Sequence, residues 1–148
     1  MSTVARVPLL LVAAAQAEVG VWGELAPRSF YDSFPGFGHH WVASMGAYDE
    51  HLLRDYAAAE LGFAVLLVCA AIWTERRLVL VAGAAFFAAT IPHFAYHLKT
   101  TGELSTADDL ASLGSFAIEL SLVGVAMLVA ARQPTGASRP KGAAYVPS

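Results

Sequence analysis

The side chains best suited to chemistry in this sequence are histidines and carboxylates that recur at helical spacing. His93 and His97 are four residues apart, as are His51 and Asp55. Residues four apart share one face of a helix, so each pair could present two ligands to one point. Imidazole and carboxylate together suit zinc, iron or copper better than calcium. The spacing therefore predicts a site for a divalent transition metal.

Two further carboxylates, Glu60 and Glu119, lie within long apolar segments. A charged group in such a segment is costly unless it points into a helical bundle, where it commonly marks a functional site. The predicted metal ligands are drawn from His93, His97, His51, Asp55, Glu60 and Glu119. Haem is the less favoured cofactor, because His93 and His97 on one helix cannot ligate opposite faces of a haem.

A layer of further polar residues is predicted around these ligands. Counting about 1.5 Å per residue along each helix places Glu18, Glu60 and Glu119 roughly 10 Å inside the outer boundary of a bilayer. Three carboxylates at one dry level cannot all stay ionised without a cation, so a metal or a bound proton is required. The other members of this layer are Asp108, Asp109, Ser112 and Arg54, and two loop histidines are additional candidate ligands, His39 and His40.

The same residues also allow an interpretation without any ligand. Protonated glutamates could be hydrogen-bonded to Ser115, Tyr56 or Gln16, and the histidines could bind loop carbonyls or solvent. Asp108 and Asp109 could simply begin a helix, where carboxylates are favourable, with Ser105 or Thr106 as the cap. Under this interpretation the polar layer is structural.

Four apolar segments must position these side chains. The chain is 57% hydrophobic and 14% charged, with a mean hydropathy of +0.55, which indicates a membrane protein. A bilayer core about 30 Å thick needs about 20 helical residues per span, and no segment alternates as a barrel strand would. The predicted spans are Val7–Leu25, Leu52–Trp73, Leu78–Leu98 and Leu110–Ala131.

The predicted fold is all-α, an integral membrane four-helix bundle with one long aromatic outer loop. The bundle occupies residues 1–132, and residues 133–148 form a flexible cytoplasmic tail, since they are rich in Pro, Gly, Ala and Ser. The loop, Ala26 to Glu50, contains six aromatic residues, so we expect it to lie on the bundle or among lipid headgroups as a cap.

Arginine and lysine residues set the expected orientation in the plasma membrane. Six of them lie on one side of this map and three on the other, so the positive-inside rule predicts a multi-pass protein with both termini cytoplasmic. An alternative reads the N-terminus as a signal peptide cleaved after Ala17. Against it, apolar character continues through Val19 to Trp22.

Two resemblances follow from these features. The run from Pro27 to Gly36, followed by Trp41, Tyr48 to Leu52, and by Pro92, His93 and His97, resembles a group of actinobacterial four-helix membrane proteins and implies no activity. The topology alone resembles the DoxX-like membrane proteins. By analogy, that resemblance implies an accessory or redox-associated role in a membrane.

Two classes of function remain open. The first is cation binding by the histidine and carboxylate cluster, and the second is a non-catalytic accessory or scaffold subunit in a homo-oligomer or larger membrane complex. Proton-coupled transport is less favoured, because the sequence has no inverted repeat. A nucleic-acid partner is not expected, since no basic run is long enough to bind phosphates. An enzyme is not favoured either, because Cys69 is far from every histidine and no serine motif occurs.

Overall fold

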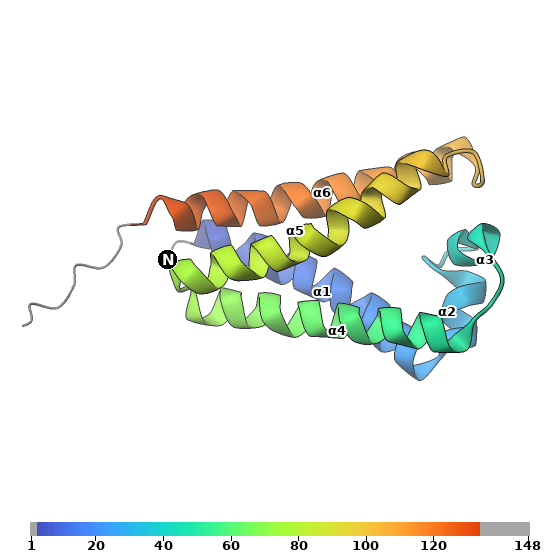
Figure 1. The fold of residues 1–148 in the computed structure, drawn as a ribbon, viewed down its shortest axis with the longest axis horizontal. Coiled ribbons are helices and arrows are strands. Elements are labelled where there is room, and N and C mark those ends of the chain that lie inside the picture. Colours follow the sequence, from blue (N-terminus) through green and yellow to red (C-terminus); the bar gives the residue numbers. More distant parts are fainter. Residues whose placement is uncertain (1–2, 134–148) are drawn as a thin grey trace, which may run out of the picture.

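The computed structural model describes residues 3–133, which form four long and two short helices (Figure 1). The long helices are α1 (Thr3–Leu25), α4 (Glu50–Trp73), α5 (Arg76–Lys99) and α6 (Thr106–Ala131). The short ones, α2 (Pro27–Ser33) and α3 (Trp41–Met45), lie between α1 and α4. The predicted all-α class is confirmed. The predicted flexible tail, apart from its first residue, lies outside the described residues.

All four long helices are long and apolar enough to cross a membrane. They contain the four predicted spans but begin two to four residues earlier. Capping explains two of these earlier starts, because a side-chain oxygen ahead of the apolar stretch binds a free backbone N–H. Asp49 accepts from Leu52 N at 3.0 Å before α4, and Ser105 accepts from Asp108 N at 3.2 Å before α6.

The long helices are packed in the cyclic order α1, α4, α5, α6. Each contacts the next, and the contact between α1 and α4 is the most extensive. Small residues permit this contact: a β-carbon at Gly20 would lie 2.9 Å from the Ala57 carbonyl oxygen, and one at Gly23 would lie 2.7 Å from the Ala57 β-carbon. Such close approach of backbones stabilises helix pairs where lipid removes the hydrophobic drive.

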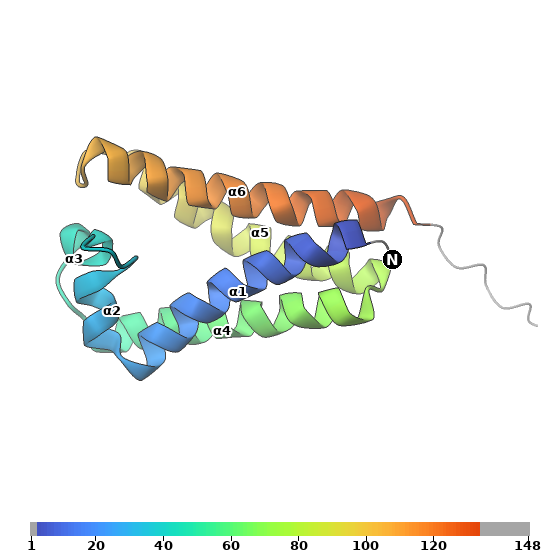
Figure 2. The ribbon, with the colours of Figure 1, turned by 180° about the vertical axis from the view of Figure 1, so that it is seen from behind.

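The main cluster of the apolar core lies towards one end of the bundle. It contains Leu9, Leu67, Phe86 and Val123 together with small alanines from all four long helices. This end also holds the start of α1, the turn between α4 and α5, and the end of α6 (Figure 2). We call it the closed end.

At the opposite end the pair formed by α1 and α4 separates from the pair formed by α5 and α6 (Figures 1 and 2). The α5 helix begins beside α4 but leans towards α6 over its second half, which contains Pro92 (Figures 1 and 2). Pro92 has no N–H and its ring clashes with the preceding turn, so it favours a bend here. Helices α2 and α3 lie at this open end, where α2 contacts α1 and α4 and α3 packs against α2 (Figure 1). The sequence predicted a cap here but neither helix.

Candidate binding pocket

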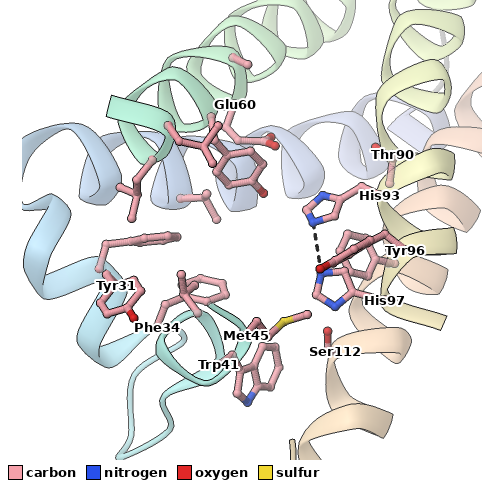
Figure 3. A pocket seen from close by; sticks show the side chains of 18 of the residues that line it. Tyr31, Phe34, Trp41, Met45, Glu60, Thr90, His93, Tyr96, His97 and Ser112 are labelled. Carbon is pink, nitrogen blue, oxygen red and sulfur yellow. Dashed lines mark hydrogen bonds between the residues drawn. The ribbon is translucent and has the colours of Figure 1, made fainter. Parts of the chain in front are cut away.

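A pocket of about 670 Å³ occupies the open end of the bundle (Figure 3). All six helices contribute to its wall. Most of the wall is apolar, and eight of the lining side chains are aromatic: Phe30, Tyr31, Phe34, Trp41, Tyr56, Phe63, Tyr96 and Phe116. An apolar concave site with a few converging polar groups is the usual form of a small-molecule site.

Four of the predicted metal ligands line this pocket. Glu60 comes from α4, His93 and His97 come from α5, and Glu119 comes from α6. Ser112, predicted as a member of the polar layer, lines it as well and is buried. The structure therefore brings together predicted residues from three of the four long helices.

The two histidines face each other across one helical turn. His93 Nε2 and His97 Nε2 lie 3.1 Å apart, so one nitrogen donates a hydrogen and the other accepts it (Figure 3). The Phe116 ring centroid lies 5.0 Å from each imidazole, and the Tyr56 ring lies edge-on to His93 at 5.7 Å. Aromatic contacts thus orient both rings towards the pocket.

Glu119 is held by a neighbour from another helix. Gln16 Nε2, on α1, donates to Glu119 Oε2 at 3.1 Å, and Gln16 is buried. This bond agrees with the interpretation that the polar layer is structural, in which Gln16 donates a hydrogen bond to a glutamate side chain. Ser115, also considered as such a partner, donates to the Ser112 carbonyl instead.

The prediction that Glu18, Glu60 and Glu119 all point into the bundle at one level is wrong for Glu18. Glu18 is exposed on α1 and does not line the pocket. Counting residues gives depth but not direction, and two positions after the inward Gln16 is about 200° around the helix at 3.6 residues per turn. Glu18 therefore points away from the bundle.

His51 and Asp55 also lie outside the pocket. They pair with each other at 3.5 Å, with side chains 90% and 65% exposed. The pocket-facing side of α4 is formed by Leu52, Tyr56 and Ala59. His51 comes one residue before Leu52, and Asp55 one residue before Tyr56. One residue corresponds to a rotation of about 100° around the helix, so both side chains point away from the pocket. The expectation that they join His93 and His97 at one site is not met.

The remaining polar residues hold helices or turns together. Arg54 Nε donates to Glu50 at 3.0 Å, and its Nη1 lies 3.4 Å from the Glu24 carboxylate on α1. Asp109 accepts from the backbone N–H of Gly102 at 2.7 Å in the turn before α6. Within residues 3–133, no group of three or more His, Cys, Asp or Glu side chains is arranged to hold a metal ion.

One carboxylate connects the cap to the bundle. Asp108 Oδ1 accepts from the Trp41 indole N–H at 2.9 Å and lies 2.7 Å from His39 Nδ1. His40 instead contacts the Asp32 carbonyl inside the cap, so neither loop histidine points at His93 or His97. Trp41 was not among the predicted site residues, because its partner lies 67 positions away and no local pattern connects them.

The cap itself is an aromatic cluster. Phe30 stacks on Phe34 at 4.8 Å between ring centroids, and Trp22 and Trp41 extend the cluster on either side. On its outer side Arg28 pairs with Asp32 at 2.8 Å, and this hydrogen bond raises the pKa of the guanidinium. The predicted aromatic cap thus has an ordered internal packing, and its Phe30, Phe34 and Trp41 side chains form part of the pocket wall.

Comparisons of the chain with family models, with curated proteins and with solved structures find no match.

The Asp108 contacts predict how firmly the cap is held. Asp108→Ala removes both bonds to the cap, and a hydrogen bond to a charged group contributes about 1.5–3 kcal/mol. We expect amide hydrogen exchange in Trp41–Met45 to become about tenfold faster or more, as followed by mass spectrometry of the protein in lipid nanodiscs.

Asp109→Ala is the matched control, because the neighbouring carboxylate binds Gly102 and not the cap. It should leave exchange in the cap unchanged. Trp41→Phe, which removes only the indole donor, should give an intermediate effect. Equal exchange in Asp108→Ala and wild type would show that Asp108 does not hold the cap.

Proposed function

We propose that this chain is a multi-pass membrane protein that binds a small, largely apolar ligand in the pocket at its open end. The observation that carries the proposal is the pocket itself. Its volume, about 670 Å³, lies within the range of about 300–1,000 Å³ typical of small-molecule sites. Aromatic walls would supply most of the binding energy, and the few polar groups would orient the ligand.

The exposed lining residues indicate how a ligand would enter. Leu52 on α4 is 67% exposed and Tyr96 on α5 is 53% exposed, although both line the pocket. The pocket is thus open between the diverging halves of α4 and α5. Leu52 and Tyr96 are about 20 residues from the closed ends of their helices, so in a bilayer this opening would lie near the lipid headgroups, which favours a ligand that partitions into the membrane.

The charge distribution supports an orientation with the pocket towards the outer face of the plasma membrane. Arg6, Arg76, Arg77 and Arg132 all belong to the closed end. Positively charged residues near span ends favour the cytoplasmic side, so both termini would be cytoplasmic. The cap and the pocket would then lie in the outer half of the bilayer.

A second function, binding of a divalent transition metal, is favoured by the His93 and His97 pair. Zinc binds imidazole nitrogen at about 2.0–2.1 Å, so nitrogens 3.1 Å apart would subtend an angle of about 100° at the metal. Two protein ligands do not complete such a site. Water or a bound ligand would therefore have to supply the remaining donors to zinc, iron or copper. Haem is the less favoured cofactor, because His93 and His97 share one helix and none of His39, His40 and His51 lines the pocket.

An accessory role in a homo-oligomer or larger complex is the remaining alternative. The Gln16 to Glu119 bond favours it, because a satisfied carboxyl needs no ligand. Exposed apolar residues such as Val65, Val81 and Leu128 would then contact a partner helix as well as lipid.

The orientation predicts which turn is reachable from outside the cell. In a Cys69→Ala background, a cysteine at Glu103, in the turn before α6, should react with a membrane-impermeant maleimide on intact cells. A cysteine at Glu75, the exposed turn residue at the closed end, should react only after permeabilisation. The reverse pattern would invert the proposed topology.

The pocket predicts saturable labelling by a neutral lipophile. A photoactivatable phenyl-diazirine, added to the protein in nanodiscs, should label the segment around Phe116 in a saturable way. Ala89→Trp adds bulk to the pocket wall and should lower this labelling about fivefold or more, as measured by peptide mass spectrometry.

Ala84→Trp is the matched control, because Ala84 is exposed on the same helix but does not line the pocket. Labelling of Ile118, which is exposed on α6, reports ordinary lipid contact and should be equal in all variants. Non-saturable labelling at Phe116, insensitive to Ala89→Trp, would favour the accessory alternative.

The metal hypothesis predicts a loss of zinc when the histidine pair is removed. Wild type dialysed with zinc and then desalted should retain nearly one equivalent by elemental analysis, and His93→Ala with His97→Ala should retain far less. His51→Ala, which changes an outward-facing histidine, should behave as wild type. Equal zinc in wild type and the double variant would exclude the pair as ligands.

A further inference from the structure

The charges that line the pocket distinguish between classes of ligand. Asp49, Glu60 and Glu119 supply three carboxylates, and no lysine or arginine of residues 3–133 lines the wall. Arg54, the nearest candidate for compensation, is bound to Glu50 and Glu24 outside the pocket. His93 and His97 are the basic groups in the wall, and their Nε2 atoms are directed at each other.

The carboxylates have acceptor capacity to spare. Glu119 uses Oε2 for Gln16, and no ion pair of Glu60 or Glu119 occurs among the described residues. A carboxylate partly removed from water is costly unless a positive group lies nearby. A cationic ligand would offset this cost, whereas an anion would increase it.

Two buried hydroxyls point to the same pocket independently of the acids. Ser112 is 4% exposed and Thr90 is 8% exposed, and both line the pocket. The Ser112 carbonyl accepts from Ser115, but no hydrogen bond of either hydroxyl is found within residues 3–133. Figure 3 shows the Ser112 side chain directed from α6 towards His97. Among the described residues Arg76 Nε is the one enclosed side-chain atom without a partner, so these two hydroxyl oxygens remain accessible and could bond a polar group in the pocket.

The aromatic wall suits a cation as well as an apolar body. Tyr56, Phe63 and Phe116 lie on α4 and α6, the helices that carry Glu60 and Glu119. Aromatic faces attract cations through their ring quadrupoles, and the attraction grows when water is excluded. Carboxylates beside aromatic rings are thus the groups that recognise an organic ammonium ion.

We propose that the ligand is a lipophilic organic cation whose charge lies between Glu60 and Glu119 and whose apolar body lies against the aromatic wall. This inference rests on the proposed ligand-binding function. A metal ion, the alternative cation, would leave most of the apolar pocket unfilled.

Two probes of nearly equal size and opposite charge test the inference, tetraphenylphosphonium and tetraphenylborate. Binding to the protein in nanodiscs is measured by equilibrium dialysis, with empty nanodiscs subtracted because both ions enter lipid. We expect the cation to bind at least about tenfold more tightly than the anion. Glu60→Gln with Glu119→Gln should remove this preference.

Glu18→Gln is the matched control, because it removes an exposed carboxylate predicted at the same depth. It should bind the cation as wild type does. Circular dichroism shows whether the double variant still folds, and Glu60→Gln alone, with an expected loss of about threefold or more, serves if it does not.

The three probes separate failure of the cation inference from failure of the proposed function. If neutral triphenylphosphine oxide or the borate binds as tightly as the phosphonium, the pocket remains a ligand site and the inference of a cation is overturned. If none of the three probes binds beyond empty nanodiscs, the proposed function itself fails. Loss of cation binding in Glu18→Gln would also overturn the inference, because it would implicate general surface charge.

Discussion

The uneven distribution of apolar packing along the bundle is the constraint on which the rest of the structure depends. Leu9, Leu67, Phe86 and Val123 close one end, where all four long helices meet. At the other end small residues still join α1 to α4, but large aromatic and ionisable side chains line the space towards α5 and α6, and Pro92 favours a bend in α5. The helix pairs therefore diverge, and the space between them is the pocket.

Much of the fold could be predicted from composition and length, because a span needs about 20 apolar residues and leaves a clear mark in the sequence. The four long helices matched their predicted spans to within a few residues. Helices α2 and α3 could not be predicted in this way. Their stability comes from contacts such as Phe30 with Phe34 and Trp41 with Asp108, which depend on tertiary packing.

The candidate site was predictable only in part, for a geometric reason. Residue counting placed Glu18 and Glu60 at similar depth, yet Glu60 lines the pocket and Glu18 is exposed. Direction around a helix changes by about 100° per residue, so it follows from which face packs against a neighbour. His93 and His97 do share one face of α5, as predicted, because their spacing of four residues matches the helical turn.

The gap between α4 and α5 has a consequence for how this pocket would compete for occupants. With Leu52 and Tyr96 at its edge, an empty pocket in a bilayer would be open to lipid near the level of the headgroups. Lipid molecules would then compete with the ligand for the pocket, and they are the most concentrated species in the membrane. Occupancy would depend on the mole fraction of a ligand in the membrane, and not on its concentration in water, so a compound with modest intrinsic affinity could still saturate the site.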